Sequence, residues 1–509
     1  MRKKLLKTFI GVFALTFGLA IASCNKEKTE DSPLEFELRG ETYAVVGAGT
    51  FDAGNLVIPA TYDGKPVTAI GANAFKLNSK IGTVTIPDSV TVIEENAFSS
   101  CTNLTEISLG GGVTEIQQKA FATCANLATV TGLDSVVSVG TKAFEWCAKI
   151  KELQFTDSLE TISESGFDSC KKLETITLGS SLEIIGARAF YNCTALQGLT
   201  IPDGAPTDIM KEAFSGCTAM EYVYLGDKVL GIGESAFNGC GQLREVEIGD
   251  SVLSIGASAF ANCRKVYQIT LGPALVRIGD AAFEKCQLLV EVYNRSNLVV
   301  EKGNDKSQGG VAKYALYVRK GDEPTRISKD ENGLVYYTVG EEKWLVAVVL
   351  KEYTHLVIPD DVTAINQYAC YNEQLITAVT IGDGCTKIGY AAFRNSYRIE
   401  FVKLGKNVKK LANAVFYNNL FITKVVINEK LEYVGEGAFH QKGTESDHKP
   451  YEYVFYEGTP EQWEQIEFAD GKSDPLQYQP VKAYYAETEP TVQDLVYWHY
   501  VDGVPTLWE

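Results

Sequence analysis

The chain has 509 residues, 45% apolar and 22% charged, so it is long enough for several domains or one repeat array and is not disordered as a whole. Its net charge of −18 argues against nucleic acid and anionic membrane surfaces as partners, because affinity for phosphate comes from clustered cations. Solubility alone also accounts for this acidity. The 45 glycines and 3 methionines favour a turn-rich β architecture over a helical one.

Residues 1–23 are predicted to be a lipoprotein signal peptide. Four cationic residues, Arg2, Lys3, Lys4 and Lys7, precede an apolar run from Phe9 to Ile21. This run is too short to span a bilayer. The run closes on Ala22, Ser23 and Cys24, and this ending resembles the lipobox of bacterial lipoproteins. The resemblance implies cleavage before Cys24 and acylation of its thiol. The alternative is an ordinary signal peptide followed by a chance cysteine.

Residues 24–35 are polar and charged and are predicted to be a solvated tether between lipid and fold. Their acidity resembles the surface-export tags of Bacteroides-type lipoproteins. No later apolar run reaches membrane-spanning length, so the lipid is the only membrane contact that we expect. Residues 36–69 are predicted to form an N-terminal cap of small strands.

A 23-residue period organises residues 70–293, the first repeat block. Its marker is a phenylalanine, usually preceded by alanine, that recurs every 23 residues with one step of 24. The recurring residues are Phe75, Phe98, Phe121, Phe144, Phe167, Phe190, Phe214, Phe237, Phe260 and Phe283. Aliphatic residues keep a fixed place five residues before each phenylalanine and six after it. This fixed phase predicts a solenoid of stacked units.

Each repeat is predicted to contain three local structures. Leu-x-x-Ile-x-Leu alternates apolar and polar residues and ends at Gly or Pro, which predicts a short strand closed by a turn. The following Val-x-x-Ile predicts a second short extended piece, and Ala-Phe-x-x-Cys predicts one helical turn. Because a 23-residue unit cannot bury these side chains alone, we expect neighbouring units to cover them.

Two motifs connect these repeats to a known family. Ile-Gly-x-x-Ala-Phe-x-x-Cys-x-x-Leu, from Ile232 to Leu243, and Ile-Pro-x-x-Val, from Ile86 to Val90, resemble the BspA-like leucine-rich repeats of Treponema and Bacteroides type. The resemblance covers roughly residues 36–509. It implies a β-rich solenoid, a right-handed leucine-rich repeat coil with short parallel strands, in two blocks with N- and C-terminal caps.

The array is interrupted over residues 294–354. Residues 302–310 are polar and glycine-rich and predict a loop. Residues 334–339 and 344–349 are strand-like runs on either side of a Gly-Glu-Glu-Lys segment, which predicts a hairpin.

A second repeat block is predicted over residues 355–440. It opens with Leu-Val-Ile-Pro at 356–359. The same four residues, at 56–59, precede the first block. The 23-residue spacing then returns at Cys370, Phe393, Phe416 and Phe439.

Residues 441–509 are predicted to form an aromatic C-terminal cap. Thr459 to Gln462 has the sequence of a capping box with proline at the first helical position, so we expect a short helix through Trp463 and Ile466. Large rings near the C-terminus are suited to covering the last apolar face of an array, and sugar stacking on them is the alternative. These rings are Tyr484, Tyr485, Tyr497, Trp498, His499, Tyr500 and Trp508.

Nine of the 12 cysteines lie three residues after the repeat phenylalanine: Cys101, Cys124, Cys147, Cys170, Cys193, Cys217, Cys240, Cys263 and Cys286. Asn78, Ser396 and Asn419 take this position elsewhere, which predicts a small buried site bonded to backbone carbonyl groups. An oxidising compartment makes disulfides an alternative. Parallel side chains on coils ~4.8 Å apart hold their Cβ atoms above the preferred ~3.8 Å, so we expect free thiols. One cysteine per coil also lacks the convergence that a metal site needs.

No catalytic arrangement emerges from the sequence. None of the four histidines lies in a His-Glu-x-x-His motif, and Gly-x-Ser-x-Gly is absent. Gly471, Lys472 and Ser473 lack the upstream glycine of a phosphate-binding loop. We therefore expect no enzyme, no cofactor and no metal.

A ligand is expected on the sheet face formed by the residues eight and ten places after each phenylalanine, which should point outward. Threonines dominate the early repeats, and strand propensity explains them. Later repeats change to aromatic and acidic residues, and exposed aromatics are typical interface anchors. The candidate patch contains Tyr222, Tyr224, Glu245, Glu247, Gln268, Glu291 and Tyr293. An ordinary strand surface is the alternative.

The sequence favours a non-catalytic, monomeric cell-envelope lipoprotein, anchored in the outer membrane and exposed at the surface. Its resemblance implies adhesion to an extracellular or surface protein of the host or of bacteria. A glycan-binding lipoprotein for nutrient capture and a structural envelope scaffold are the alternatives.

Overall fold

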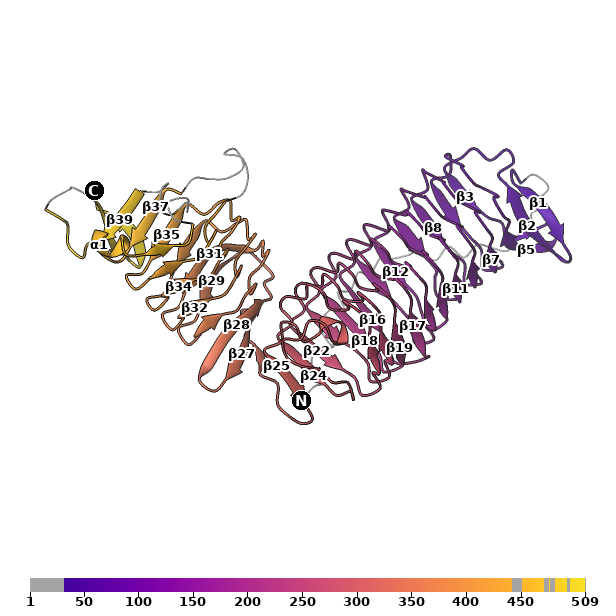
Figure 1. Cartoon of the computed structure of the whole chain (residues 1–509). Coiled ribbons are helices and arrows are strands. Elements are labelled where there is room, and N and C mark those ends of the chain that lie inside the picture. Colours follow the sequence, from indigo (N-terminus) through magenta and orange to yellow (C-terminus); the bar gives the residue numbers. More distant parts are fainter. Residues whose placement is uncertain (1–31, 442–450, 471–475, 477–480, 492–494, 509) are drawn as a thin grey trace.

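The computed structural model describes residues 32–441, 451–470, 476, 481–491 and 495–508. The predicted signal peptide and Cys24 therefore lie outside the described residues. The chain forms two stacks of coils that follow one another and meet at an angle (Figure 1). No helix in the described part is long and apolar enough to cross a membrane.

In the first block, each coil adds one short strand to a 13-stranded sheet, in which the repeated strands pair in parallel. This sheet continues an antiparallel start made by β1 and β2. Its strands are β1 (Glu35–Arg39), β2 (Thr42–Gly47), β4 (Thr61–Tyr62), β5 (Lys65–Ile70), β7 (Val92–Ile93), β9 (Glu115–Ile116), β11 (Ser138–Val139), β13 (Thr161–Ile162), β15 (Ile184–Ile185), β17 (Thr207–Ile209), β19 (Val229–Ile232), β21 (Ser254–Ile255) and β23 (Arg277–Ile278).

A second row of parallel strands forms another side of the same coils. The register advances by one repeat per strand, as Glu106 pairs with Thr129, and by 24 residues where Gly198 pairs with Tyr222. The strands are β3 (Asn55–Val57), β6 (Thr83–Thr85), β8 (Glu106–Ser108), β10 (Thr129–Thr131), β12 (Glu152–Gln154), β14 (Thr175–Thr177), β16 (Gly198–Ile201), β18 (Tyr222–Leu225), β20 (Glu245–Glu247), β22 (Gln268–Leu271), β24 (Glu291–Asn294) and β25 (Tyr317–Lys320).

The repeat phenylalanines form one continuous column inside the coils. All ten in the first block are at most 1% exposed, and successive rings stack with centroids 5.0–5.4 Å apart. The aliphatic residues at fixed phase surround them in a single core cluster. The stacked solenoid predicted from the period is thus confirmed.

The third side of each coil is a run of turns, and the helical turn predicted there is wrong. Around Phe98, every second N–H group donates to the next coil, as Phe98 N does to Ala120 O at 2.7 Å. The N–H groups between them donate three residues back, as Cys101 N does to Phe98 O at 3.1 Å. Asn96 and Ser100 have left-handed φ angles of 55° and 61°. A helical turn needs negative φ and hydrogen bonds within one coil, so the geometry excludes it.

The repeat cysteines are free and buried, as predicted. Each Sγ donates to the carbonyl oxygen of the preceding repeat phenylalanine at 3.1–3.4 Å, as Cys101 does to Phe75. Asn419 Nδ2 makes the same bond to Phe393 O at 2.9 Å. The position therefore requires a small hydrogen-bond donor, which explains why Cys and Asn interchange there.

The second block repeats the design with its own core cluster. One sheet contains β26 (Ile327–Lys329), β27 (Leu334–Val339), β28 (Glu342–Val348), β30 (Ala364–Ile365), β32 (Lys387–Ile388), β34 (Lys410–Leu411), β36 (Tyr433–Val434) and β38 (Glu467–Phe468). The other contains β29 (Thr354–Ile358), β31 (Ile376–Ile381), β33 (Phe401–Lys403), β35 (Lys424–Ile427), β37 (Tyr453–Tyr456), β39 (Val481–Tyr485), β40 (Val496–Val501) and β41 (Val504–Leu507).

The segment between the blocks contains the predicted hairpin. Strands β27 and β28 pair in antiparallel fashion, and β28 starts the parallel ladder of the second block. The polar loop holds only the short 3₁₀ helix η1 (Gln308–Gly310). A small apolar cluster that includes Tyr267, Val290, Val335 and Val346 joins the two blocks.

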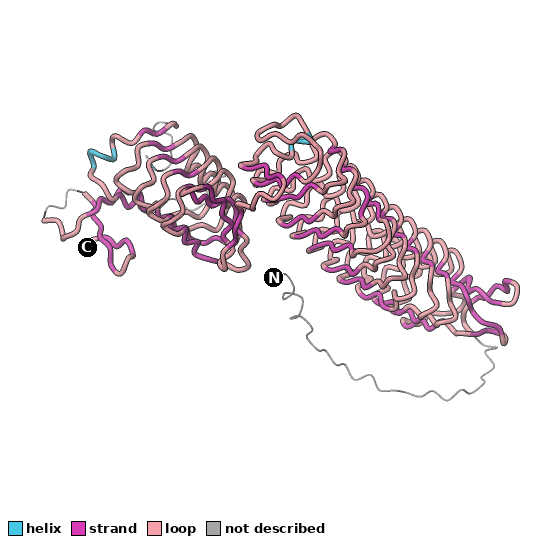
Figure 2. The backbone as a smooth tube through the Cα atoms, turned by 90° about the horizontal axis from the view of Figure 1, so that it is seen from below, coloured by secondary structure: helices cyan, strands magenta, loops and turns pink. Residues whose placement is uncertain are grey.

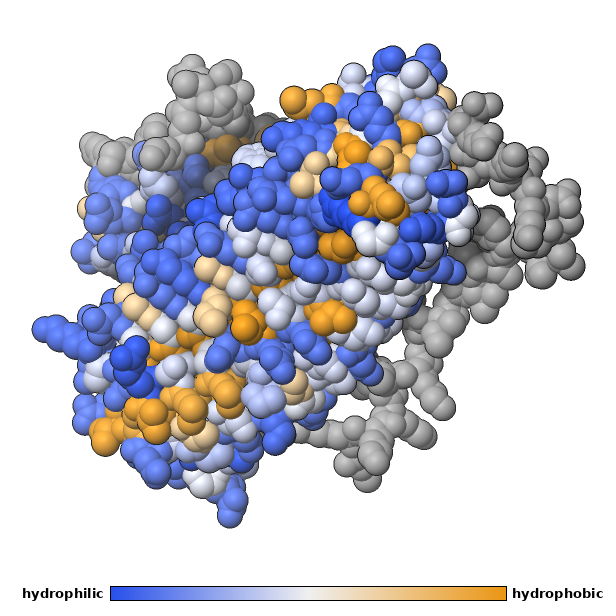
Figure 3. All heavy atoms as spheres, turned by 90° about the vertical axis from the view of Figure 1, so that its right-hand side faces the viewer, coloured by the Kyte–Doolittle hydropathy of each residue, from blue (hydrophilic) through white to orange (hydrophobic). Residues whose placement is uncertain are grey.

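Both ends of the array are covered. At the N-terminal end, the Phe36 and Tyr62 rings stack at 3.9 Å, and hydrophilic side chains cover most of the surface seen from that end (Figure 3). At the C-terminal end, Trp498 is fully buried and donates from Nε1 to Tyr456 O at 3.1 Å. The helix α1 (Pro460–Trp463) has the predicted capping box and ends before Ile466.

Candidate ligand-binding face

The outward register predicted for the strand residues is confirmed in the middle of the first block. On β14, Thr175 and Thr177 are exposed, and on β12 the side chain of Leu153 points inward and is buried. The face is therefore a row of short strands that presents two side chains per coil.

Two tyrosines on β18 form the aromatic part of the patch. The Tyr222 and Tyr224 rings stack with centroids 5.2 Å apart, and Tyr222 is 38% exposed. The Tyr222 ring lies directly over Gly198 of the preceding coil. A Cβ atom on residue 198 would lie 2.2 Å from the Tyr222 ring carbon Cζ. Glycine at this point of β16 thus makes room for the ring.

The acidic part of the patch adjoins these rings. Tyr224 donates from its hydroxyl to Glu245 Oε2 at 2.7 Å, and Glu247 on the same strand β20 is exposed. Burial, together with this hydrogen bond, raises the pKa of Tyr224, so its hydroxyl keeps its proton to a higher pH than that of an ordinary tyrosine. Lys329 borders the patch, with its Nζ 3.4 Å from Glu245 Oε1. The structure thus brings together four of the predicted residues, Tyr222, Tyr224, Glu245 and Glu247.

Glu291 does not belong to an exposed face, and this prediction is wrong. Its side chain is fully buried on β24, because the chain between β25 and β26 passes over it. Thr325 Oγ1 donates to Glu291 Oε1 at 2.8 Å, and Arg326 N donates to Oε2 at 2.9 Å. Gln268 Nε2 also donates to Glu291 Oε1 at 2.8 Å, so Gln268 helps to hold this segment in place.

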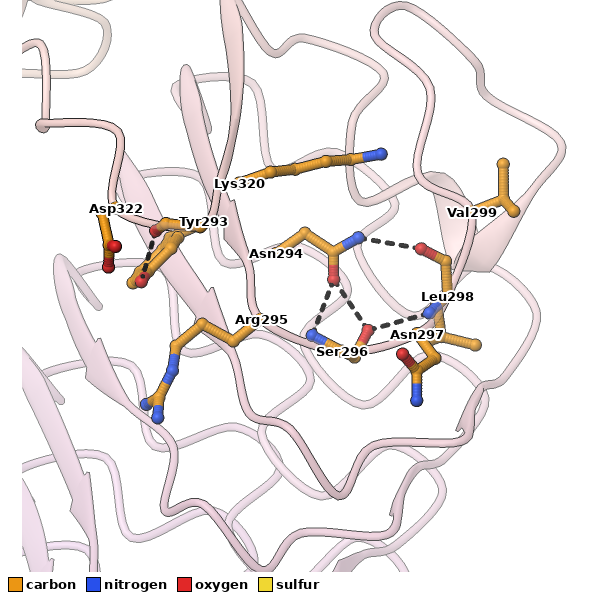
Figure 4. A pocket seen from close by; sticks show the side chains of 10 residues that line it. Tyr293, Asn294, Arg295, Ser296, Asn297, Leu298, Val299, Lys320 and Asp322 are labelled. Carbon is orange, nitrogen blue, oxygen red and sulfur yellow. Dashed lines mark hydrogen bonds between the residues drawn. The ribbon is translucent and has the colours of Figure 1, made fainter.

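Tyr293 lies three coils beyond the other tyrosines and has partners of its own. Its hydroxyl donates to Gly321 O at 2.9 Å, and the Arg319 guanidinium lies 3.4 Å from its ring centre. It lines a cavity of about 480 Å³ at the ends of β24 and β25 (Figure 4). Asn294 in this cavity is satisfied by Ser296 and by Leu298 O. The polar groups of Tyr293 and Asn294 are thus already hydrogen-bonded within the protein.

Sequence reasoning missed a buried ionic cluster where the blocks meet. Glu373, in the second block, is 4% exposed and lies 2.9 Å from Lys265 Nζ and 3.6 Å from Arg244 Nη2, both of the first block. Burial lowers the pKa of Lys265, although Glu373 opposes this effect. Glu373 occupies the position that holds Cys, Asn or Ser in other repeats, and a carboxylate in that buried position was the available signal.

No three side chains of His, Cys, Asp or Glu are grouped so as to hold a metal ion in the part of the chain that the structure describes.

The comparisons with known proteins agree with the repeat pattern. The family model described as "BspA type Leucine rich repeat region (6 copies)" matches residues 68–197, 183–302 and 350–448. No curated protein matches the chain.

Several solved structures are similar. A leucine-rich repeat protein from Bacteroides ovatus is 18% identical, with 89% of this chain and 98% of that chain covered and a TM-score of 0.40. A leucine rich cell surface protein from Faecalibacterium prausnitzii is 19% identical, with 88% and 99% covered and a TM-score of 0.29. A leucine-rich repeat protein from T. pallidum is 22% identical, with 43% and 91% covered and a TM-score of 0.32.

Proposed function

The chain belongs to the BspA-type leucine-rich repeat family. We propose that it is a non-catalytic surface protein and that it binds another protein through the patch of Tyr222, Tyr224, Glu245 and Glu247. Repeat solenoids bind through extended faces of this kind. The observation that supports the proposal most is the exposed, stacked tyrosine pair, because tyrosine is enriched among the residues that dominate protein interfaces.

The acidic side chains would select the partner. Glu247 is exposed and places negative charge beside the rings, whereas Glu245 is paired with Lys329 and accepts from Tyr224. The surface that complements Glu247 is therefore basic. The complex should accordingly form faster at low salt, because screening weakens attraction between exposed charges.

Replacing both Tyr222 and Tyr224 by alanine is expected to weaken binding at least tenfold, because the two rings supply the apolar contact area of the patch. The measurement is capture of the protein on an array of immobilised host matrix and bacterial surface proteins, with a glycan array beside it. Alanine at both Thr175 and Thr177, on the same face, is the matched control and should bind like the unaltered chain. Unchanged binding by the tyrosine variant would reject the patch.

We further propose that Cys24 is acylated after removal of residues 1–23 and that the lipid anchors the protein in the outer membrane. Cys24→Ser is expected to abolish incorporation of labelled palmitate and to release the protein from the membrane fraction. Cys101→Ser, which changes a buried thiol, should leave labelling intact. Palmitate that still enters the Cys24→Ser chain would contradict the lipid site, and protease treatment of intact cells tests surface exposure.

A further inference from the structure

A second recess lies where the two blocks meet, and no residue of the tyrosine patch lines it. The backbone trace shows the two stacks of coils adjoining each other at this point (Figure 2). It is a cleft of about 380 Å³, lined by the turn sides of the last coils of the first block and the first coil of the second. This volume lies within the range typical of small-molecule sites.

The charge of the cleft is opposite to that of the chain. The protein carries 65 acidic and 47 basic side chains, yet none of the described residues that line the cleft is Asp or Glu. Arg264 and Lys265 line it, and Lys265 is neutralised by Glu373 at 2.9 Å. Arg264 Nη1 donates to the Tyr371 hydroxyl at 3.2 Å and has no carboxylate partner among the described residues. The cleft thus presents one guanidinium group that lacks a counter-charge.

The rest of the polar lining consists of amides and a phenol. Side-chain amides come from Gln242, Asn262, Gln287 and Asn372. Asn262 Nδ2 donates to Asn238 Oδ1 at 2.9 Å and Asn372 Oδ1 accepts from Gln374 Nε2 at 3.3 Å, so these two amides keep only their other atoms for a ligand. Gln287 Oε1 is buried and has no hydrogen-bond partner in the described structure, and such orphaned acceptors are uncommon in native proteins.

The Tyr371 hydroxyl adds a hydrogen-bond donor to the same cleft. Its oxygen accepts from Arg264 and, at 3.3 Å, from Asn395 Nδ2, and no acceptor for its own hydrogen is found among the described residues. The Tyr368 and Tyr371 rings pack edge to face beside it, with centroids 5.7 Å apart. A ligand that suits this wall must both donate and accept hydrogen bonds and must offer a face to aromatic rings.

We propose that this cleft binds an acidic saccharide. Sugar hydroxyls both donate and accept, so they can pair with the amides, with Gln287 Oε1 and with the Tyr371 hydroxyl. The anionic group of the sugar, a carboxylate or a sulfate ester, pairs with the Arg264 guanidinium, whose planar fork fits such groups. The inference does not depend on the tyrosine patch, because no residue of that patch lines the cleft.

The test is calorimetric titration of the full chain with three trisaccharides: a galacturonic acid trimer, its neutral galactose counterpart and a sulfated galactose trimer. At least one acidic trimer is expected to bind at least tenfold more tightly than the neutral one, and salt should weaken it. Which acidic trimer binds better identifies the anionic group. Absence of binding by both, or equal binding of the neutral trimer, would overturn the proposal.

Two variants locate the binding. Arg264→Gln is expected to lower the affinity for the acidic trimer at least tenfold and to remove most of its salt dependence, since a charge-assisted hydrogen bond is lost. Gln287→Leu should lower the affinity several-fold without a change in salt dependence. Arg277→Gln, an exposed arginine on β23 outside the cleft, is the matched control and should stay within twofold.

Two further outcomes would refute the site. Affinity that is unchanged in both Arg264→Gln and Gln287→Leu would place the sugar elsewhere. A glutamate tripeptide that binds as tightly as the galacturonic acid trimer would show that the cleft recognises charge on a peptide and not a sugar. Thermal unfolding of each variant confirms that it is folded before its affinity is compared.

Discussion

Replacing Phe167 by alanine is expected to lower the free energy of unfolding of the first block by about 3–5 kcal/mol. The Phe167 ring is fully buried and stacks between Phe144 at 5.1 Å and Phe190 at 5.2 Å. The substitution removes apolar contacts on both sides and leaves a cavity that the neighbouring coils cannot fill, because each is held by two strand ladders. Guanidinium denaturation followed by circular dichroism measures the change.

The end of the column provides the control. Phe75 has one ring neighbour in the column, Phe98, so Phe75→Ala should cost clearly less than Phe167→Ala. Trp146 is the only tryptophan between residues 70 and 293, and its fluorescence follows the first block. Equal losses for the two variants, or a loss below 1 kcal/mol at Phe167, would show that the column is not the main source of coupling between coils.

Raising the pH above about 9 is expected to unfold the first block cooperatively. Burial is the largest cause of a raised pKa for six thiols of the cysteine column, and it raises the pKa of Cys286 to about 12. The other five are Cys147, Cys170, Cys193, Cys217 and Cys263. Below pH 8 the folded and unfolded chains both keep these protons, so the thiols contribute no pH dependence.

Between pH 9 and 11 the unfolded chain loses these protons while the folded chain keeps them. The unfolded state then binds fewer protons, so the free energy of unfolding falls as the pH rises. Each thiol contributes about 1.4 kcal/mol per pH unit, and six together contribute on the order of 8 kcal/mol per unit. This is comparable with the whole stability of a typical domain, about 5–15 kcal/mol.

Denaturation curves recorded between pH 8 and 11 in the presence of a reductant measure this effect. Cys170→Ser is the matched variant, since Ser396 fills the same position in the second block. It should reduce the slope by about 1.4 kcal/mol per pH unit. A first block whose stability is constant from pH 8 to 11 would contradict the expected role of the thiols.

The coil, the phenylalanine column and the free cysteines could be predicted because each depends on residues that recur at one phase. An apolar side chain such as Phe121, repeated every 23 residues, is buried only if coils stack, and stacking then places Cys124 beside a backbone carbonyl group. The turn side could not be predicted in this way. Whether Phe98 N bonds within its own coil or to Ala120 O depends on backbone angles to which Ala and Phe give no clue.

The candidate patch was predicted only where the chain itself repeats. Tyr222, Tyr224, Glu245 and Glu247 lie where the register put them. Glu291 has the same position in its repeat as Glu245 but is buried, because Thr325 and Arg326 come from a segment without periodicity. Contacts between the blocks, such as Lys265 with Glu373, join residues 108 apart and leave no periodic trace in the sequence.

The hydrogen bonds of the turn side affect how the molecule responds to force. In the first block, they run from coil to coil along the long axis beside the continuous ladder of the 13-stranded sheet, whereas the second row of strands is paired in four separate groups. A pull on the two ends loads the continuous ladder and the turn-side bonds together, and bending must shorten one of these rows while it lengthens the other. Each block should therefore behave as a stiff rod that lengthens by about 4.8 Å per coil. A partner bound at a given coil is then held at a fixed distance from the N-terminal end of the block.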